Sequence, residues 1–219
     1  MAGTQEQPAA NGAPSPFSPG LQALAERGEL RHYRRNTLII QEGDVGDTLF
    51  IILAGRLKAF SMGAKDREIT FGIYGPGEYV GEMSLDGGPR SASVITLEPS
   101  VCTVVTRHTL KQHIAQHPEF ALELLAKVIR RARMATRDAR NMALLDAYGR
   151  LVRLLDELAV PQGDGTRVIH ERLTHAEIAS RVGCSREMVS RLMKDLERGG
   201  YLAANGASIR LKSHLPSNW

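Results

Sequence analysis

The sequence predicts an α+β chain in which an antiparallel β-sandwich precedes one long helix, two short helices and a β-hairpin. Three observations predict this order: β-rich segments between glycines up to Thr106, a glycine-free stretch after Pro118, and two capped helix patterns within residues 173–196. With 219 residues, 42% hydrophobic and 24% charged, the chain has the composition of a globular protein with room for two domains.

The first 20 residues carry four of the ten prolines and no apolar periodicity, which predicts a disordered tail over 1–20. A short helix is expected next, at Leu21–Arg27. The glycines between the following segments have the spacing of turns in an antiparallel sandwich of the jelly-roll kind, which we place within 21–117. The expected strands are Thr37–Gln41, Thr48–Leu53, Arg56–Phe60, Glu68–Tyr74, Ser91–Leu97 and Val101–Thr106.

One long helix is predicted over 118–144, where no glycine and no further proline occur after Pro118. Its apolar and small residues recur at steps of three and four, which is typical of a seam between two helices. We therefore predict self-dimerisation through this helix, and packing of the same stripe on the chain's own sandwich is the alternative. The stripe is Leu122, Leu125, Ile129, Ala132, Thr136, Ala139 and Ala143.

The formal net charge of +4 is concentrated on the long helix. Residues 127–140 hold six basic side chains and one acid, Asp138, so the rest of the chain is nearly neutral. A basic run of this length is most often a solvated helix face. The basic run would have a binding role only if an anionic ligand binds close to it.

The last segment, 145–219, is expected to contain one helix, then a pair of short capped helices, and a β-hairpin. Asp146 is placed to cap a helix that ends at about Leu158. Further on, Thr174 and Glu177 form a capping-box pattern, Gly183 stands where a tight turn requires positive φ, and Ser185 is placed to cap a second helix. Residues 199–211 are expected to form a β-hairpin wing.

The exposed face of the second helix has the chemistry of a DNA-reading surface. Arginine can donate two hydrogen bonds to guanine and glutamate can accept one from cytosine, while Thr174 and Ser185 are candidates for phosphate contacts. A helix pair that packs on another protein is the alternative interpretation. The side chains of the face are Arg186, Glu187, Ser190, Arg191 and Lys194.

Two motifs resemble the cyclic-AMP receptor protein/FNR (catabolite activator) superfamily of transcription regulators. Val182-Gly-Cys-Ser-Arg-Glu-Met-Val-Ser-Arg191 is similar to its winged helix-turn-helix, and Gly81-Glu-Met-Ser-Leu-Asp-Gly-Gly-Pro-Arg-Ser-Ala92 to its phosphate-binding cassette. The resemblance extends over about Leu21–Leu211. It implies a cyclic-nucleotide-binding β-roll, a dimerisation helix, and a DNA-binding domain in a dimeric, cytoplasmic bacterial regulator.

The resemblance also implies roles for individual residues. Arg186, Glu187 and Arg191 would contact bases of TGTGA-like half-sites in a palindrome, and RNA polymerase is an expected partner. Glu82 would bond a ribose hydroxyl, while Arg90 and Ser91 would hold a cyclic phosphate, and a guanidinium fork suits a buried phosphate. The full set expected around the ligand is Gly81, Glu82, Met83, Ser84, Arg90, Ser91, Ala135 and Thr136.

The identity of the effector follows less directly, because the sequence departs from the family on the long helix. Cyclic-AMP-responsive members have a Thr-Ser pair where this chain has Ala135 and Thr136. Arg133, Arg137 and Arg140 would suit the second phosphate and guanine of cyclic di-GMP, to which some relatives respond. We place cyclic AMP first because the cassette is intact, with cyclic di-GMP and no nucleotide effector as alternatives.

Other classes of protein have less support in the sequence. The chain lacks the N-terminal cysteines of the family's iron–sulfur branch, and its two cysteines, Cys102 and Cys184, are expected to be free thiols. His113 and His117 have metal-ligand spacing, but a solvated helix is the preferred interpretation, so no metal and no tightly bound cofactor are expected. We find neither a catalytic group nor a secretory or membrane segment. The alternative to a DNA-binding regulator is a nucleotide-binding module that controls a partner protein.

Overall fold

The computed structural model describes residues 16–64 and 67–216, so residues 1–15 of the predicted tail lie outside the described residues. Helix α1 (Pro19–Ala25) begins two residues before the helix predicted at Leu21. Ser18 caps it, because its Oγ accepts from the backbone amide of Leu21 at 3.2 Å, and Pro19 fits the first turn. The predicted end of the tail at residue 20 is therefore wrong by two residues.

The chain forms two compact units. One consists of the segments up to Leu57 and Tyr74–Ala121, and the other of Lys58–Ile73 and the chain from Leu122 onward. Among the described residues, no helix combines the length and the apolar character needed to cross a membrane.

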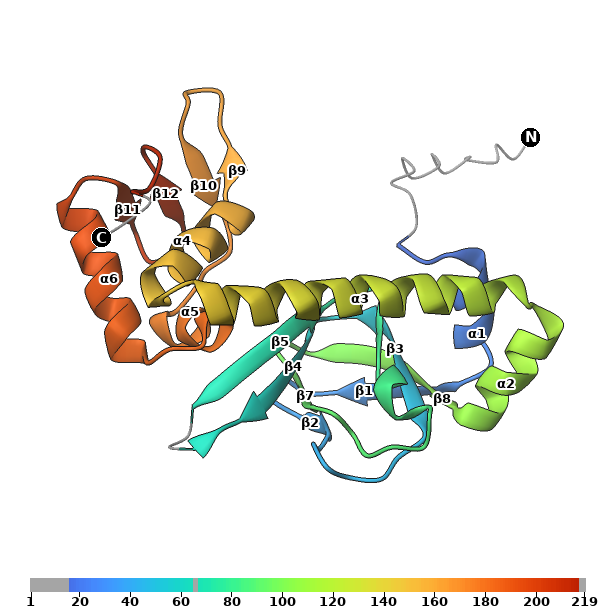
Figure 1. The fold of residues 1–219 in the computed structure, drawn as a ribbon. Coiled ribbons are helices and arrows are strands. Elements are labelled where there is room, and N and C mark those ends of the chain that lie inside the picture. The colour runs from blue at the N-terminus through green and yellow to red at the C-terminus, as the bar shows by residue number, and fades with distance from the viewer. Residues whose placement is uncertain (1–15, 65–66, 217–219) are drawn as a thin grey trace, which may run out of the picture. The chain divides into compact units, whose positions relative to one another are not determined.

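The N-terminal part is built from eight strands, six of which coincide with predicted segments (Figure 1). One sheet has the order β1-β8-β3-β6, and a second has the order β2-β7-β4-β5. In the first sheet Leu49 pairs with Val105 and Ile51 with Thr103, and the four consecutive residues Leu49–Ile52 of β3 are all buried. The strands are β1 (Glu29–Tyr33), β2 (Leu38–Ile40), β3 (Thr48–Ala54), β4 (Leu57–Met62), β5 (Glu68–Tyr74), β6 (Tyr79–Val80), β7 (Ser93–Thr96) and β8 (Ser100–Thr106).

Helix α2 (Arg107–Gln116) packs against β8. The sequence predicted that the helix with His113 and His117 is solvated, and this is wrong for His113, whose side chain is buried with 1% exposed. Its ring lies edge-on to Phe120, with centroids 5.0 Å apart, and 4.8 Å from the ring of His117. His117 itself is exposed, as predicted.

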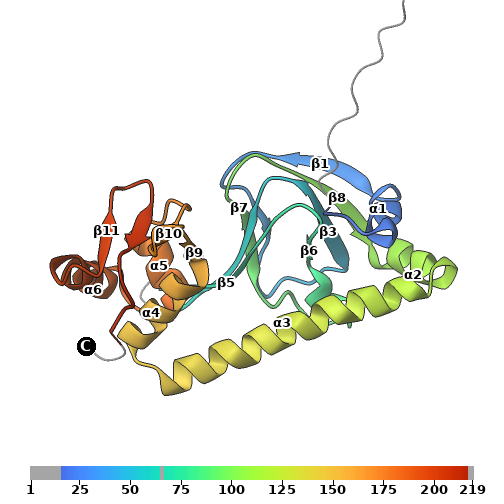
Figure 2. The same ribbon diagram turned by 90° about the horizontal axis from the view of Figure 1, so that it is seen from above.

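Helix α3 (Glu119–Leu144) runs without a break, as Figure 2 shows. Its length confirms the long helix predicted over 118–144 to within one residue. Within the single chain the large residues of the predicted stripe are exposed: 70% of Leu122, 52% of Leu125 and 41% of Ile129.

The C-terminal part is formed by three helices and a small sheet around one core (Figure 1). Leu151, Leu155, Ile178, Val189 and Leu196 are completely buried in this core. The predicted wing is β11 and β12, and the hairpin β9–β10 extends it to a sheet with the order β11-β12-β10-β9. The elements are α4 (Ala147–Leu158), β9 (Val160–Pro161), β10 (Arg167–Ile169), α5 (His175–Val182), α6 (Arg186–Arg198), β11 (Leu202–Ala204) and β12 (Ile209–Leu211).

Together these elements confirm the predicted α+β fold: an N-terminal β-sheet domain, a long helix and a C-terminal helix-turn-helix domain with a wing.

Candidate functional site

The predicted cassette places Arg90 in the interior of the first unit, with 7% of the residue exposed. Its Nη1 donates to the carbonyl oxygens of Thr48 and Gly81, both at 3.0 Å, and to Ser84 Oγ at 2.8 Å. Its Nη2 donates to Thr48 Oγ1 at 2.9 Å. All four acceptors are neutral, and no carboxylate of the described residues lies within ion-pair distance of Arg90. The result is a buried cation without a direct counter-ion.

The loop between β2 and β3 wraps around the backbone of Arg90. Gly43 N donates to Arg90 O at 2.9 Å, and Arg90 N donates to Asp44 O at 2.8 Å. Burial lowers the pKa of the Arg90 guanidinium, whereas the charges of Asp47 and Glu82 act in the opposite direction. Because buried charges in proteins are normally paired, this arrangement favours an anionic ligand.

The remaining cassette residues form a tight turn next to Arg90. Gly81 has φ +94°, which favours glycine, and Glu82–Ser84 forms a short 3-10 helix. Met83 and Ser91 are exposed, whereas Ser84 is buried and its Oγ donates to Gly81 O at 3.2 Å. Ser84 therefore contacts Arg90 and the turn, and the structure brings it together with Gly81, Glu82 and Arg90.

Ala135 and Thr136 are exposed on α3, and Thr136 Oγ1 donates to the carbonyl of Ala132 at 3.0 Å. They belong to the second unit, whereas Arg90 belongs to the first. Their predicted role at the ligand stays a prediction.

The helix-turn-helix has each of the predicted caps. Thr174 Oγ1 accepts from Glu177 N at 3.2 Å, and Glu177 Oε2 accepts from Thr174 N at 2.6 Å, which completes the capping box. Gly183 ends α5 with φ +72°, and Ser185 Oγ accepts from Met188 N at 3.2 Å at the start of α6. These local bonds fix where both helices begin and where the turn lies.

Helix α6 buries one side and exposes the other. Val189, Leu192 and Leu196 face the core, as predicted. The five predicted DNA-reading residues are all exposed, on the side away from the core. Hydrogen bonds from its own backbone amide and from Ser185 lower the pKa of Glu187, which favours the carboxylate as an acceptor. Arg191 Nη2 lies 2.9 Å from Met188 Sδ.

Two side chains that the sequence analysis did not single out, Arg150 and Met142, hold this motif in place. Arg150 on α4 donates from Nε to Val182 O at 2.8 Å and from Nη1 to Leu145 O at 2.6 Å. The side chain of Met142, near the end of α3, lies directly against the Cα of Gly183. The helix-turn-helix is thus connected to the end of the long helix through its tight turn.

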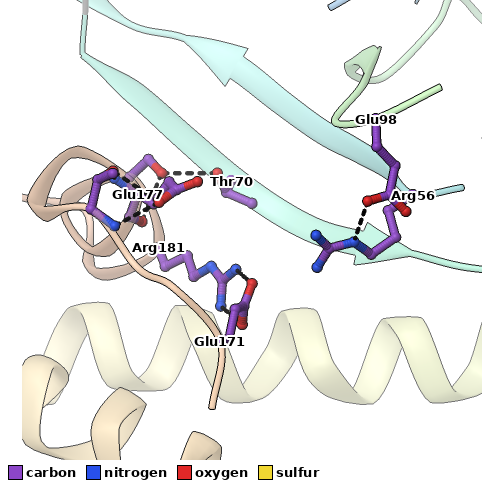
Figure 3. Close-up of polar contacts among 8 residues, drawn as sticks. Arg56, Thr70, Glu98, Glu171, Glu177 and Arg181 are labelled. Carbon is purple, nitrogen blue, oxygen red and sulfur yellow. Dashed lines mark hydrogen bonds and ion pairs between the residues drawn. The ribbon is translucent and has the colours of Figure 1, made fainter. Parts of the chain in front are cut away.

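Within the second unit, α5 also contacts strand β5 (Figure 3). Thr70 Oγ1 and Ser180 Oγ lie 3.0 Å apart, and Ser180 Oγ also donates to Glu177 O at 3.0 Å. Arg181 and Glu171 form an ion pair of 2.8 Å beside them. In the first unit, Arg56 and Glu98 approach to 3.5 Å between the start of β4 and the turn before β8.

The described residues contain no group of three or more His, Cys, Asp or Glu side chains that could hold a metal ion. Both cysteines are free, as predicted. Thr48, Thr70 and Arg150 were missed as site residues, because each acts through a partner more than 30 residues away or through backbone atoms.

Two family models match the chain in the order in which these features occur. The model of the cyclic nucleotide-binding domain matches residues 30–117, and that of the Crp-like helix-turn-helix domain matches residues 149–214. The first match contains the Arg90 network, and the second contains both capped helices and the wing.

Whole-length relatives cover both parts. The CRP-like cAMP-activated global transcriptional regulator of Mycobacterium tuberculosis is 32% identical over 194 residues, which cover 86% of each chain. The cAMP-activated global transcriptional regulator CRP of Haemophilus influenzae is 30% identical over 187 residues, covering 82% of each. A solved structure of the c-di-GMP responsive global regulator CLP of Xanthomonas campestris has a TM-score of 0.77 and 27% identity, covering 89% of this chain and 98% of that one.

Proposed function

The chain belongs to the cyclic-AMP receptor protein/FNR superfamily of transcription regulators, and from this premise we propose that it is a homodimer whose DNA affinity is controlled by a cyclic nucleotide. The proposed domains are a β-roll sensor over 21–117, a dimerisation helix over 118–144 and a DNA-binding domain over 145–219. The single observation that carries the proposal is that one chain combines a buried arginine, with no carboxylate of the described residues within ion-pair distance, in a nucleotide-binding fold with a capped helix that has an exposed polar face.

For the DNA, α6 is proposed to enter the major groove. Arg186 and Arg191 would read guanines and Glu187 a cytosine of a TGTGA-like half-site. Ser190 and Lys194, further along the same exposed face, would add contacts within the groove. Thr174 and Ser185 stand at helix N-termini, where backbone amides favour phosphates.

For the effector, the β-roll is proposed to bind the cyclic phosphate at Arg90 and Ser91, with Glu82 at the ribose. Gly81 and the turn through Met83 and Ser84 would form the wall of this site. The supporting observation is the guanidinium of Arg90, which has four neutral acceptors and no carboxylate among the described residues within ion-pair distance.

Cyclic AMP is proposed as the effector, because the cassette is complete and because two relatives at 30–32% identity are named as activated by cAMP. Cyclic di-GMP is the second candidate. Arg133, Arg137 and Arg140 are exposed along α3 beside Ala135 and Thr136, and a relative of 27% identity is described as responsive to c-di-GMP. Arginines suit two phosphates and guanine better than they suit adenine.

The dimer is proposed to form along α3. Leu122, Leu125 and Ile129 are exposed by 41–70% in the single chain, which is a large apolar stripe to leave in water. A second copy of the helix would cover the stripe, and the alanines further along would let the two backbones approach closely. The two recognition helices would then lie about 34 Å apart, which explains a palindromic site.

The switch is proposed to work as a population shift. A nucleotide at the seam near Thr136 would favour one arrangement of the DNA-binding domains about a hinge at Leu144–Asp146. It can do so only to the extent that it binds the DNA-competent arrangement more tightly. As a regulator of transcription in the cytoplasm, the dimer would contact RNA polymerase.

A gel-shift series tests the DNA-reading assignment. Arg186→Ala is expected to weaken binding to the palindrome and to relax its preference for guanine, at a cost of about 1–3 kcal/mol. Arg198→Ala is the matched control, because Arg198 is exposed at the far end of the same helix, 3.9 Å from Asp195. Equal binding by wild type and Arg186→Ala would refute the assignment and favour a module that acts on a partner protein.

A further inference from the structure

We infer that Thr48 and Ser84 are positioning residues for the anion of the proposed nucleotide, which they orient by holding Nη1 and Nη2 of the Arg90 guanidinium. This inference rests on the proposed nucleotide site. It assigns to Thr48 a role that the cassette motif does not contain, because Thr48 lies 42 residues before Arg90. It also changes the role of Ser84 from a ligand contact to a support of Arg90.

The hydrogen bonds of Arg90 are distributed unevenly over its five N–H groups. Three acceptors converge on Nη1, and the Thr48 hydroxyl takes a bond from Nη2. Among the described residues, no acceptor is bonded to Nε. A guanidinium offers two N–H groups side by side along its Nε–Nη2 edge, and this edge matches a phosphate.

An anion therefore has one favourable direction of approach. At the Nη1 end it would meet the carbonyl oxygens of Thr48 and Gly81, which carry partial negative charge. At the Nε–Nη2 edge it would meet donors. Residue 46 is a glycine there, and a Cβ at this position would lie only 2.8 Å from Nη2 and 2.9 Å from Nε. Glycine at position 46 therefore avoids a side-chain collision with this edge of the guanidinium.

The two hydroxyls hold different nitrogens of the guanidinium: Ser84 Oγ accepts from Nη1 and Thr48 Oγ1 accepts from Nη2. Ser84 Oγ accepts from Arg90 at 2.8 Å and donates to Gly81 O at 3.2 Å, so it links the guanidinium to the turn of the cassette. Thr48 holds Arg90 through two atoms, its carbonyl and its hydroxyl. A side chain fixed in this way loses less conformational freedom when it binds an anion.

The test is a calorimetric titration of the full-length protein with cyclic AMP and, separately, with cyclic di-GMP. Thr48→Val and Ser84→Ala are each expected to raise the Kd of the bound nucleotide about tenfold, which corresponds to about 1.4 kcal/mol. Thr48→Ser, which keeps the hydroxyl, is expected to stay within about twofold of wild type. Thr103→Val on β8 is the matched control, because Thr103 lies outside the Arg90 network.

A double-mutant cycle separates support of Arg90 from a general loss of structure. In an Arg90→Lys background, Thr48→Val is expected to change the Kd by less than about twofold, since the group that it supports is gone. An unchanged or lower Kd for Thr48→Val in the wild-type background would overturn the inference, because the hydroxyl would then be neutral or compete with the anion. A tenfold loss that persists in the Arg90→Lys background would overturn it as well.

A measurement without ligand keeps the two proposals distinguishable. Side-chain nitrogen NMR should resolve separate Nη1 and Nη2 signals for Arg90, which collapse to one averaged signal in Ser84→Ala and Thr48→Val. If the wild type binds neither nucleotide, the proposed effector fails, whatever the NMR result. If it binds one but Arg90 gives an averaged signal without ligand, the proposed site stands and the positioning role is refuted.

Discussion

Arg150 on α4 donates from Nε to the backbone carbonyl of Val182, the last residue of α5, over 2.8 Å. The carbonyls at the end of a helix have no partner within the helix, so this bond satisfies one of them at the turn of the helix-turn-helix. The same guanidinium donates to Leu145 O at 2.6 Å, between α3 and α4. One side chain thus connects the end of the long helix, α4 and the DNA-reading motif.

Replacing Arg150 by methionine removes both bonds while keeping an unbranched side chain of similar length. Hydrogen bonds to a charged group contribute about 1.5–3 kcal/mol, and Arg150 is half-buried, so we expect Arg150→Met to lower the free energy of unfolding by about 1–3 kcal/mol. Urea unfolding followed by circular dichroism measures it. Arg198→Met, at an exposed ion pair, should change it by less than about 0.5 kcal/mol, and an equal loss in the two variants would contradict the role given to Arg150.

Gly183 and Gly200 separate two effects of adding a methyl group. Both have positive φ, +72° and +77°, so alanine at either position should cost about 1–2 kcal/mol of strain. At Gly200 a Cβ meets nothing within 4 Å, whereas at Gly183 it would collide with Met142 Cε. Because Met142 Cε is the end of a flexible, exposed side chain that can move aside, we expect Gly183→Ala and Gly200→Ala to lower the midpoint of urea unfolding by similar amounts. A clearly larger loss in Gly183→Ala would contradict this and would show that Met142 is held in place against the turn.

His113 should make the stability of the protein depend on pH. Burial lowers its pKa below 6.5, with smaller contributions from His117 and Arg27, against the opposing effects of the Gly20 backbone and Glu119. The folded chain therefore takes up a proton on His113 at a lower pH than the unfolded chain, in which the imidazole takes up a proton near pH 6.5. The free energy of unfolding should therefore have its full value above pH 6.5. It should fall as the pH drops below 6.5, by at most about 1.4 kcal/mol per pH unit.

Urea unfolding at pH 7.5 and pH 5.5 tests the role of His113. The difference between the two pH values is expected to shrink in His113→Phe, which keeps a ring next to Phe120. His108→Phe, at an exposed position on the same helix, should retain the full difference. If His113→Phe keeps the wild-type pH dependence, other groups cause it.

The two thiols should differ in reactivity. Burial raises the pKa of Cys102 to about 11, and its side chain is completely buried in β8. Burial also raises the pKa of Cys184, but this residue is only half-buried, beside the turn of the helix-turn-helix. Because the thiolate is the reactive form, we expect an alkylating reagent at pH 8 to label Cys184 slowly and Cys102 only after unfolding. Mass spectrometry of the labelled peptides gives the order.

The sequence was informative wherever a contact is local. The caps at Asp146, Thr174 and Ser185 join residues three apart, so their spacing alone predicts them. The continuous apolar run of β3 and the glycine-free length of α3 predict those elements for the same reason. The chemistry of the cassette and of α6 then follows from motifs that are contiguous in the chain.

Long-range contacts and weakly patterned segments could not be predicted. The Thr48–Arg90 bond joins residues 42 positions apart, and only the folded sheet brings them together. Strand β1 is largely exposed, so it lacks the alternation that marks a half-buried strand, and β6 has only two residues. His113 has a polar side chain on a helix with little amphipathic pattern, so its burial depends on Phe120 and α1, which no local signal specifies.

A cyclic nucleotide is proposed to control the affinity of this protein for a palindrome. Fluorescence anisotropy of a labelled duplex with two TGTGA-like half-sites, titrated with the protein at constant salt, tests it directly. We expect the Kd to change by at least about tenfold on addition of saturating cyclic AMP or cyclic di-GMP, and Arg90→Ala to abolish the change. A Kd that is the same with and without both nucleotides would contradict the claim.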